Sequence, residues 1–298
     1  MKVLIAGCSG QVGFELQRSL SIFGEIDSPD RDRLDLEDMC RVADYLEETS
    51  PDLIVNAAAW TAVDEAEKKH DAVFAMNAAL PELLANYAAK NNIWLIHYSS
   101  DYVYPGTGSL PWSETDEKGP MSVYGQSKLQ GDQNVISSGC DYLIFRTSWV
   151  YSARGSNFMK TMLTLGASRE SLSVVNDQCG VPVPARLIAE VTAQAVTSIS
   201  QPIVPRVGVY NLATRGETSW YEFACSIFDL ARERDVTLKV AEVNGIPSSQ
   251  YLTPAKRPMN SRLSLGKIEQ EFHITMPDWY SQLQLTLDEY LSLNNGEE

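Results

Sequence analysis

The first residues of the chain combine a short apolar run with three regularly spaced glycines. Lys2–Ala6 has the apolar and β-branched character of a buried strand, and Gly7, Gly10 and Gly13 follow it with two residues between successive glycines. From Phe14 to Phe23, apolar residues then recur at helical spacing. A strand that turns directly into a helix through glycines restricts the chain to folds built from βα units.

The same alternation continues through the first half of the chain. Further strands are expected at Glu25–Asp27, Leu53–Asn56, Trp94–Ser99 and Tyr142–Thr147, and amphipathic helices at Glu37–Glu48, Leu80–Asn91 and Tyr124–Ile136. Strands that alternate with helices are typical of parallel sheets covered on both faces. The pattern predicts an α/β fold, with a Rossmann-type doubly wound parallel sheet as an NAD(P)-binding domain over residues 1–150.

The second half of the chain is less regular. Prolines interrupt it often, as at Pro182, Pro184 and Pro254, and helices are expected at Ala185–Ile199 and Trp220–Arg234 with short strands between them. We predict that residues 151–298 mainly form a smaller C-terminal α/β substrate-binding lobe, with some of the chain returning to the Rossmann sheet. The terminal residues Asn294–Glu298 are expected to fray.

Composition limits the partners and the compartment. A formal net charge of −15 opposes binding to nucleic acid or to an anionic membrane surface. No apolar run reaches the ~18 residues of a membrane span, and the N-terminal run is too short for a signal peptide. The five cysteines are scattered without Cys-x-x-Cys spacing, which favours buried thiols over disulfides or a metal site. We expect a cytoplasmic protein with a small-molecule ligand.

The glycine turn is a typical site for the pyrophosphate of a dinucleotide. Glycine allows the backbone to approach the phosphates, which the free N–H groups and the dipole of the following helix attract. The alternative is a turn that is merely tight. The predicted cofactor contacts are Gly7, Gly10, Gln11, Val12, Asp30, Arg31, Asp35, Leu36, Ala57, Ala58, Ala59, Thr61, Tyr124 and Lys128.

Residues after the second strand bear on the choice of cofactor. Asp30 lies where an acidic residue would bind the adenosine ribose of NAD, but Arg31 could pair with the 2′-phosphate of NADP. The sequence leaves NADH and NADPH open. Asp35 could cover the adenine or cap the helix expected near Glu37. The small residues Ala57–Ala59 suit backbone packed against a flat cofactor, and the alternative is tight helix packing.

A tyrosine and a lysine lie four residues apart at the start of a predicted helix. Tyr124 and Lys128 therefore share one helix face, and Ser100 lies at the carboxyl end of the preceding strand. Together they predict carbonyl reduction: the nicotinamide supplies hydride, Tyr124 supplies a proton, and Ser100 donates a hydrogen bond to the developing oxyanion. Lys128 is expected to lower the tyrosine pKa and hold the nicotinamide ribose. Each residue alone could equally be structural.

Longer motifs bring a family resemblance that covers nearly the whole chain. They are GCSGQVGFELQRSL, PDLIVNAAAWTAVDEAE, HYSSDYVYPGTG, PWSETD, VYGQSKLQGD, LIFRTSWVY, SLSVVNDQCGVPV and TPAKRPMNSRL. The sequence resembles the dTDP-4-dehydrorhamnose reductases, within the extended short-chain dehydrogenases. The resemblance implies reduction of dTDP-4-dehydro-6-deoxy-L-mannose to dTDP-L-rhamnose by NADPH or NADH, the last step of dTDP-L-rhamnose synthesis.

The resemblance also implies roles for individual residues. Tyr124 would be the acid, Lys128 its partner, and Ser100 would fill a hydroxyl position usually held by threonine. The implied substrate-binding residues are Ser100, Asp101, Tyr102, Trp149 and Arg257. Trp149 would be a stacking platform for the sugar, or else a core residue. Lys256, Arg257 and Arg262 would form a basic cluster for the diphosphate, or else solvated charges.

One departure concerns a metal. Some members of this family dimerise around Mg²⁺ held by interface carboxylates. Glu15 and Glu190 match two of these ligands, but Arg186 stands where a third acidic ligand is expected. Because a cation opposes Mg²⁺ binding, we expect no metal, with Arg186 paired to these glutamates in a monomer or homodimer.

Two other functions compete with this interpretation. The first is a nucleotide-sugar epimerase or dehydratase of the same fold. A dehydratase would carry Asp-Glu after the strand-end hydroxyl, whereas here Tyr102 follows Asp101. The second is a non-catalytic regulatory subunit, against which the intact Ser100, Tyr124 and Lys128 argue.

Overall fold

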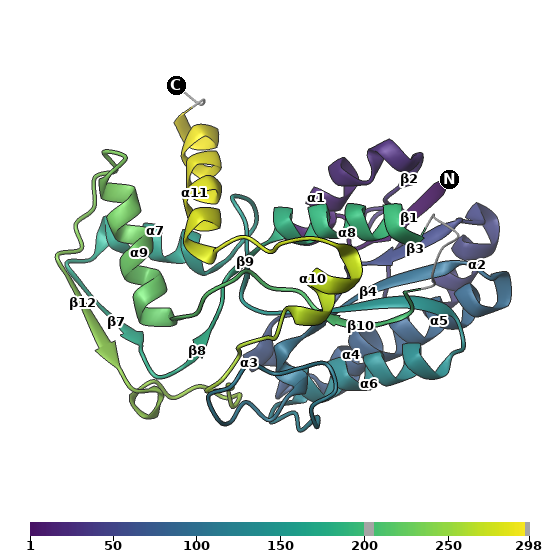
Figure 1. Cartoon of the computed structure of the whole chain (residues 1–298), viewed down its shortest axis with the longest axis horizontal. Helices are drawn as coiled ribbons and strands as arrows, with labels where there is room; N and C mark the ends of the chain where they lie inside the picture. The colour runs from purple at the N-terminus through teal and green to yellow at the C-terminus, as the bar shows by residue number, and fades with distance from the viewer. Residues whose placement is uncertain (200–205, 296–298) are drawn as a thin grey trace.

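The computed structural model describes residues 1–199 and 206–295. At its centre lies a six-stranded sheet in the order β10-β5-β4-β3-β1-β2, in which every neighbouring pair is parallel (Figure 1). The strands are β1 (Lys2–Ala6), β2 (Glu25–Asp27), β3 (Leu53–Asn56), β4 (Trp94–Ser100), β5 (Asp141–Thr147) and β10 (Gly208–Asn211). The predicted Rossmann-type α/β fold is confirmed. Strand order reverses between β1 and β3, and at such a reversal parallel sheets bind ligands beyond the strands' carboxyl ends.

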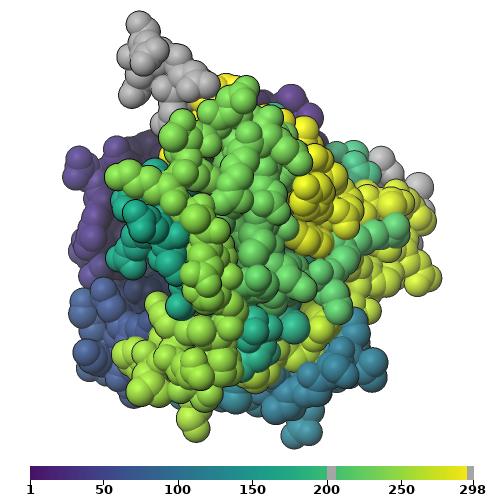
Figure 2. All heavy atoms as spheres, turned by 90° about the vertical axis from the view of Figure 1, so that its left-hand side faces the viewer, coloured from purple at the N-terminus to yellow at the C-terminus, as the bar shows by residue number. Residues whose placement is uncertain are grey.

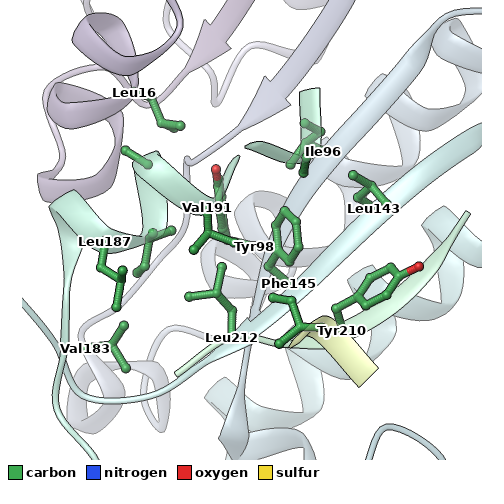
Figure 3. Packing of buried hydrophobic residues seen from close by; sticks show 14 of the residues in the cluster. Leu16, Ile96, Tyr98, Leu143, Phe145, Val183, Leu187, Val191, Tyr210 and Leu212 are labelled. Carbon is green, nitrogen blue, oxygen red and sulfur yellow. The ribbon is translucent and has the colours of Figure 1, made fainter. Parts of the chain in front are cut away.

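Alternating side chains of each strand enter two different cores, which is why helices cover both faces. Val3 and Ile5 of β1 join one core, while Leu4 and Ala6 join the other. The first core is covered by α1 (Gln11–Ser19), α8 (Ala185–Ile199) and α10 (Gly266–Phe272). The second is covered by α2 (Met39–Thr49), α5 (Leu80–Asn91) and α6 (Val123–Ser137). Figure 3 shows Leu16 of α1 and Leu187 of α8 packing toward Tyr98 and Phe145 of the sheet.

Between β3 and α5 the chain forms two short helices and one wide turn. They are α3 (Val63–Ala66), α4 (His70–Phe74) and a π-helical turn at Ala75–Ala79 that continues into α5. Val73 of α4 and Val123 of α6 belong to one small apolar cluster. This segment therefore packs beside the start of α6, where the Tyr–Lys pair begins.

The remaining elements form a smaller lobe with its own core. Its strands are β6 (Val150–Tyr151), β7 (Ser171–Val175), β8 (Cys179–Gly180), β9 (Val183–Pro184), β11 (Thr218–Ser219) and β12 (Glu242–Ile246), and its helices are α7 (Phe158–Ser168), α9 (Trp220–Arg232) and α11 (Trp279–Asn295). Met159, Phe223, Phe228 and Leu283 are fully buried where α7, α9 and α11 meet. Figure 2 looks onto this lobe, with α9 and the chain after it, in green to yellow-green, across the centre of the face.

Several element boundaries differ from the expected ones. Helix α1 begins at Gln11 rather than Phe14, and α2 begins at Met39 because Asp38 caps it by accepting a hydrogen bond from the Arg41 backbone N–H (3.0 Å). Three elements from beyond residue 150, α8, β10 and α10, belong to the Rossmann sheet or cover it. The division at residue 150 therefore stays a prediction about function.

The last helix of the chain ends close to the C-terminus. Helix α11 includes Asn294 and Asn295, the first two residues of the tail expected to fray, and residues 296–298 lie outside the described residues. Over residues 1–199 and 206–295, no helix combines the length and apolar character needed to cross a membrane.

Candidate active site

The predicted catalytic residues meet at the carboxyl end of β4. Ser100 is the last residue of β4, and Tyr124 and Lys128 lie in the first turns of α6. Ser122 caps this helix by accepting a hydrogen bond from the Gly125 backbone N–H (3.2 Å). A Cβ atom on Gly125 would lie 2.4 Å from the Tyr102 carbonyl oxygen, so glycine is required for α6 to approach the end of β4 this closely.

Burial dominates the electrostatics of these groups. Burial raises the pKa of Tyr124 to about 12, and a hydrogen bond with Ser100 partly opposes this. Burial lowers the pKa of Lys128 to about 8, opposed by the charge of Asp132. The Lys128 ammonium donates to the Tyr98 carbonyl oxygen at 2.6 Å. In the protein itself the phenol pKa thus moves away from neutrality, contrary to the lowering expected from Lys128.

Asp101 lies behind the serine. Its side chain is buried, the Ser100 hydroxyl donates to its Oδ1 atom (2.9 Å), and Ser261 from the far end of the chain hydrogen-bonds to it. Burial raises the pKa of this carboxyl to about 6. The structure therefore places Asp101 as a support of Ser100, and direct contact of Asp101 with a substrate stays a prediction.

Most of the predicted cofactor residues line one pocket of about 320 Å³ at the carboxyl ends of β1 and β2. They are Gly7, Gly10, Asp30, Arg31, Asp35, Leu36, Ala57, Ala58 and Ala59. The pocket also includes Cys8, Glu37 and Met76, which the sequence did not single out. The structure thus gathers in one place residues that are far apart in the sequence.

The glycine turn fits the phosphates of a dinucleotide. Gly7 has a φ of +85°, and a Cβ atom there would lie 2.6 Å from the backbone nitrogen of Ala58. A Cβ atom on Gly13 would lie 2.1 Å from the Gly7 carbonyl oxygen, so this glycine lets α1 pack against the turn. No side chain caps α1 at Gly10, and its first turn carries no acidic residue. The N–H groups of this helix end are thus free to attract an anion.

Five predicted cofactor residues do not line this pocket: the catalytic pair Tyr124 and Lys128, and Gln11, Val12 and Thr61. The side-chain Oε1 atom of Gln11 accepts a hydrogen bond from the side-chain amide of Asn157 (2.9 Å), which ties the turn to the start of α7. Val12 packs against the first core, and Thr61 is exposed. Their cofactor contacts stay predictions.

The rim of the pocket is rich in charge. Arg31 lies 3.1 Å from Glu37 and 3.7 Å from Asp35, so its guanidinium is already shared between two carboxylates. The alternative in which Asp35 caps the following helix is wrong, because Asp38 is the cap. Asp35 lies instead in the pocket, where the cofactor interpretation had put it.

A larger pocket of about 620 Å³ opens in the lobe between α7, β7 and the loop before Arg257. Its walls include Phe158, Gln178, Trp220, Tyr251 and Arg257. Trp149, the expected stacking platform, does not line it. The ring of Trp149 stacks on that of Trp220, with centroids 3.7 Å apart and an interplanar angle of 15°. The tryptophan in the pocket wall is therefore Trp220, which sequence reasoning missed although the Ser219–Glu222 capping box marks the helix start beside it.

The predicted basic cluster does not act as one group. Arg257 lines the pocket and pairs with Asp64 at 2.7 Å, Arg262 pairs with Glu217 at 2.5 Å, and Lys256 is exposed. Arg262 does not line the pocket, so the binding of all three cations to one diphosphate stays a prediction.

One residue of the pocket wall, Arg257, lies near Tyr102, the neighbour of the catalytic tyrosine. The pKa of Tyr102 is raised by burial, and the nearby guanidinium of Arg257 opposes that rise. The ring of Tyr102 meets that of Tyr124 edge-on, with centroids 5.3 Å apart. Arg257 of the pocket wall therefore lies near Tyr102, whose ring contacts that of Tyr124.

The charges around Arg186 match the expectation in part. Arg186 lies 3.4 Å from Glu190 and 3.8 Å from Glu289, a carboxylate that the sequence did not indicate. Glu15 is buried, and burial raises its pKa while the charge of Arg186 opposes the rise. The pairing with Glu190 is confirmed. The absence of a bridging Mg²⁺ stays a prediction.

A Rossmann-type sheet, a glycine turn at its first βα junction, and a Tyr–Lys pair facing a buried serine are the features of NAD(P)-dependent reductases of the short-chain dehydrogenase class. Comparison with known families narrows this class. The model of the RmlD substrate binding domain matches residues 1–292, and the chain belongs to this family.

Curated relatives and solved structures agree with the family. The dTDP-4-dehydrorhamnose reductase of Salmonella typhimurium is 44% identical over 284 residues, with 94% of each chain covered. That of Escherichia coli K12 is 42% identical over 297 residues, covering 97% of this chain and 98% of the relative. The Clostridium acetobutylicum and Bacillus anthracis enzymes of the same name each have a TM-score of 0.89, at 33% and 31% identity, and each covers 97% of this chain and 99% of its own. The structure of the B. anthracis enzyme is a complex with NADP.

Proposed function

We propose that this protein reduces the 4-keto group of dTDP-4-dehydro-6-deoxy-L-mannose with NADPH or NADH, forming dTDP-L-rhamnose in the last step of its synthesis. One observation carries the proposal: Ser100, Tyr124 and Lys128 meet at the edge of the sheet where the glycine turn also lies. The curated relatives named dTDP-4-dehydrorhamnose reductase, alike over nearly their whole length, support this choice of substrate.

The dinucleotide, when bound, supplies the hydride that reaches the carbonyl carbon. Tyr124 gives its proton to the carbonyl oxygen, and a phenol whose pKa burial raises to about 12 carries that proton at neutral pH. The Ser100 hydroxyl donates a second hydrogen bond to the oxygen as negative charge develops. Lys128, held by the Tyr98 carbonyl, places a positive charge on the same helix face as Tyr124 and stabilises the phenolate that remains.

The 620 Å³ pocket is the proposed place of the nucleotide. Its aromatic wall, Trp220, offers a flat apolar surface, and Arg257 offers a cation to a diphosphate. This local charge matters because a protein of net charge −15 otherwise repels an anionic substrate. The nearness of Arg257 to Tyr102, whose ring contacts Tyr124, supports a pose in which the sugar end of such a ligand lies next to Tyr124.

The two competing functions have less support. A dehydratase would need a further acid beside Asp101, and the next residue is Tyr102, whose ring packs against Tyr124. A regulatory subunit would have no use for a Tyr–Lys–Ser group whose lysine and serine are buried, because a buried lysine costs stability. We further propose a cytoplasmic monomer or homodimer that binds neither nucleic acid nor membrane.

The test is oxidation of NADPH and NADH, followed by absorbance, with enzymatically generated dTDP-4-dehydro-6-deoxy-L-mannose. Tyr124→Phe is expected to reduce turnover at least ~100-fold while cofactor binding is retained. Tyr87→Phe is the matched control, because its phenol binds the Leu46 carbonyl far from the site and its loss should leave turnover intact. Absence of wild-type turnover with both cofactors, despite cofactor binding, would overturn the substrate assignment.

A further inference from the structure

One ion pair joins the Rossmann half of the chain to the wall of the substrate pocket. Asp64 lies on α3, and its carboxylate accepts hydrogen bonds from both terminal nitrogens of Arg257, at 3.2 and 2.7 Å. Asp64 Oδ1 also accepts from the backbone N–H of Ala255 (3.1 Å). A single carboxylate therefore fixes both the guanidinium and the backbone two residues before it.

This geometry leaves part of the guanidinium available. A carboxylate in this fork uses one N–H of each terminal nitrogen, so three of the five N–H groups of Arg257 remain for another acceptor. Arg257 lines the 620 Å³ pocket, and its side chain is 27% exposed. Arg257 thus lines the pocket, while Asp64, which holds its guanidinium, does not.

We propose that Asp64 is a positioning residue for binding of the nucleotide-sugar: it holds Arg257 in the orientation in which the guanidinium meets the diphosphate. The inference rests on the proposed function, from which the diphosphate follows. It assigns to the Asp of the Trp-Thr-Ala-Val-Asp segment a role in the substrate site, although this segment belongs to the cofactor half of the chain.

Asp64 has two opposing effects on the affinity for a diphosphate, and their relative sizes decide whether removal of its carboxylate weakens or strengthens binding. An unrestrained arginine loses side-chain freedom when it binds a ligand, which weakens binding by roughly tenfold. The negative charge of Asp64 repels a diphosphate, but the Asp64 side chain is 39% exposed and is neutralised by Arg257, so this repulsion is worth only about twofold. The gain from orienting Arg257 exceeds the repulsion, so removal of the carboxylate is expected to weaken binding of the diphosphate.

The experiment compares Asp64→Asn with Glu217→Gln. Glu217→Gln is a matched control because it breaks a similar two-nitrogen pair with Arg262, which does not line the pocket. The Kd of dTDP, measured by calorimetry without cofactor, and the KM of the nucleotide-sugar are both expected to rise about tenfold in Asp64→Asn. The kcat and the KM of NADPH should stay within about twofold, and Glu217→Gln should match the wild type.

A double-mutant cycle separates positioning from general damage. Arg257→Lys keeps the charge but loses the fork, so Asp64→Asn should add little to it if both act through one contact. Additive effects, or dTDP binding that is unchanged or tighter in Asp64→Asn, would overturn the inference. If Asp64→Asn does not fold, weaker dTDP binding by Arg257→Lys supports the inference and unchanged binding overturns it.

Calorimetry with dTDP also keeps the two proposals apart. If the wild type binds dTDP but does not turn over the keto-sugar, the proposed reaction fails, while the contrast between Asp64→Asn and Glu217→Gln still tests Asp64.

Discussion

Asp132 and Arg146 form a fully buried ion pair that links the catalytic helix to the sheet. Arg146 of β5 contacts Asp132 Oδ2 through Nε (3.0 Å) and a terminal nitrogen (2.9 Å), with side chains 3% and 0% exposed. The other terminal nitrogen donates to the Tyr104 hydroxyl (3.1 Å). Asp132→Asn keeps the shape but leaves a buried guanidinium without its counter-charge. We expect a loss of about 3 kcal/mol in the free energy of unfolding, the lower end of the range for a broken buried pair.

Urea unfolding followed by tryptophan fluorescence measures this loss, together with a decrease of about 6–10 °C in Tm. Asp141→Asn is the control, because Asp141 lies exposed at the start of the same strand and should change stability by less than about 0.5 kcal/mol. Replacing both partners, Asp132→Leu with Arg146→Met, should recover most of the loss if the unpaired charge is its cause. A change below about 1 kcal/mol in Asp132→Asn would refute the reasoning.

Three further outcomes are expected. Lys128→Met should lose turnover but raise the free energy of unfolding at pH 7 by about 1–2 kcal/mol. The reason is that burial lowers the pKa of Lys128 to about 8 in the folded protein from the ordinary 10.5, so protonated Lys128 destabilises the folded state. Because the unfolded chain binds more protons between pH 8 and 10.5, the gain should shrink over that range in unfolding experiments. Glu37→Gln removes the nearer of the two carboxylates of Arg31 and should lower the KM of NADPH relative to NADH by about threefold, and equal KM ratios would contradict this. Trp220→Ala should raise the KM of the nucleotide-sugar about tenfold with the KM of NADPH unchanged, and a larger effect of Trp149→Ala would restore Trp149 as the platform.

Much of the fold and part of the site followed from local patterns. The strand at Lys2–Ala6, the helix at Leu80–Asn91 and the helix at Ala185–Ile199 agree with the structure at both ends. These segments are predictable because a buried strand and an amphipathic helix each repeat apolar residues with their own period. The glycine turn and the Tyr124–Lys128 spacing are local too, so they were visible before the fold was known.

Contacts between distant segments were not predictable in this way. The sequence alone determined the parallel α/β sheet, the glycine turn and the shared helix face of Tyr124 and Lys128, since each depends on neighbours along the chain. Tertiary structure alone decided that Trp220 rather than Trp149 lines the pocket, and that Arg257 meets Asp64 while Arg262 meets Glu217. The physical reason is that the partner of a charge and the exposed face of a ring depend on which distant segments pack together. Composition and periodicity do not indicate which segments these are.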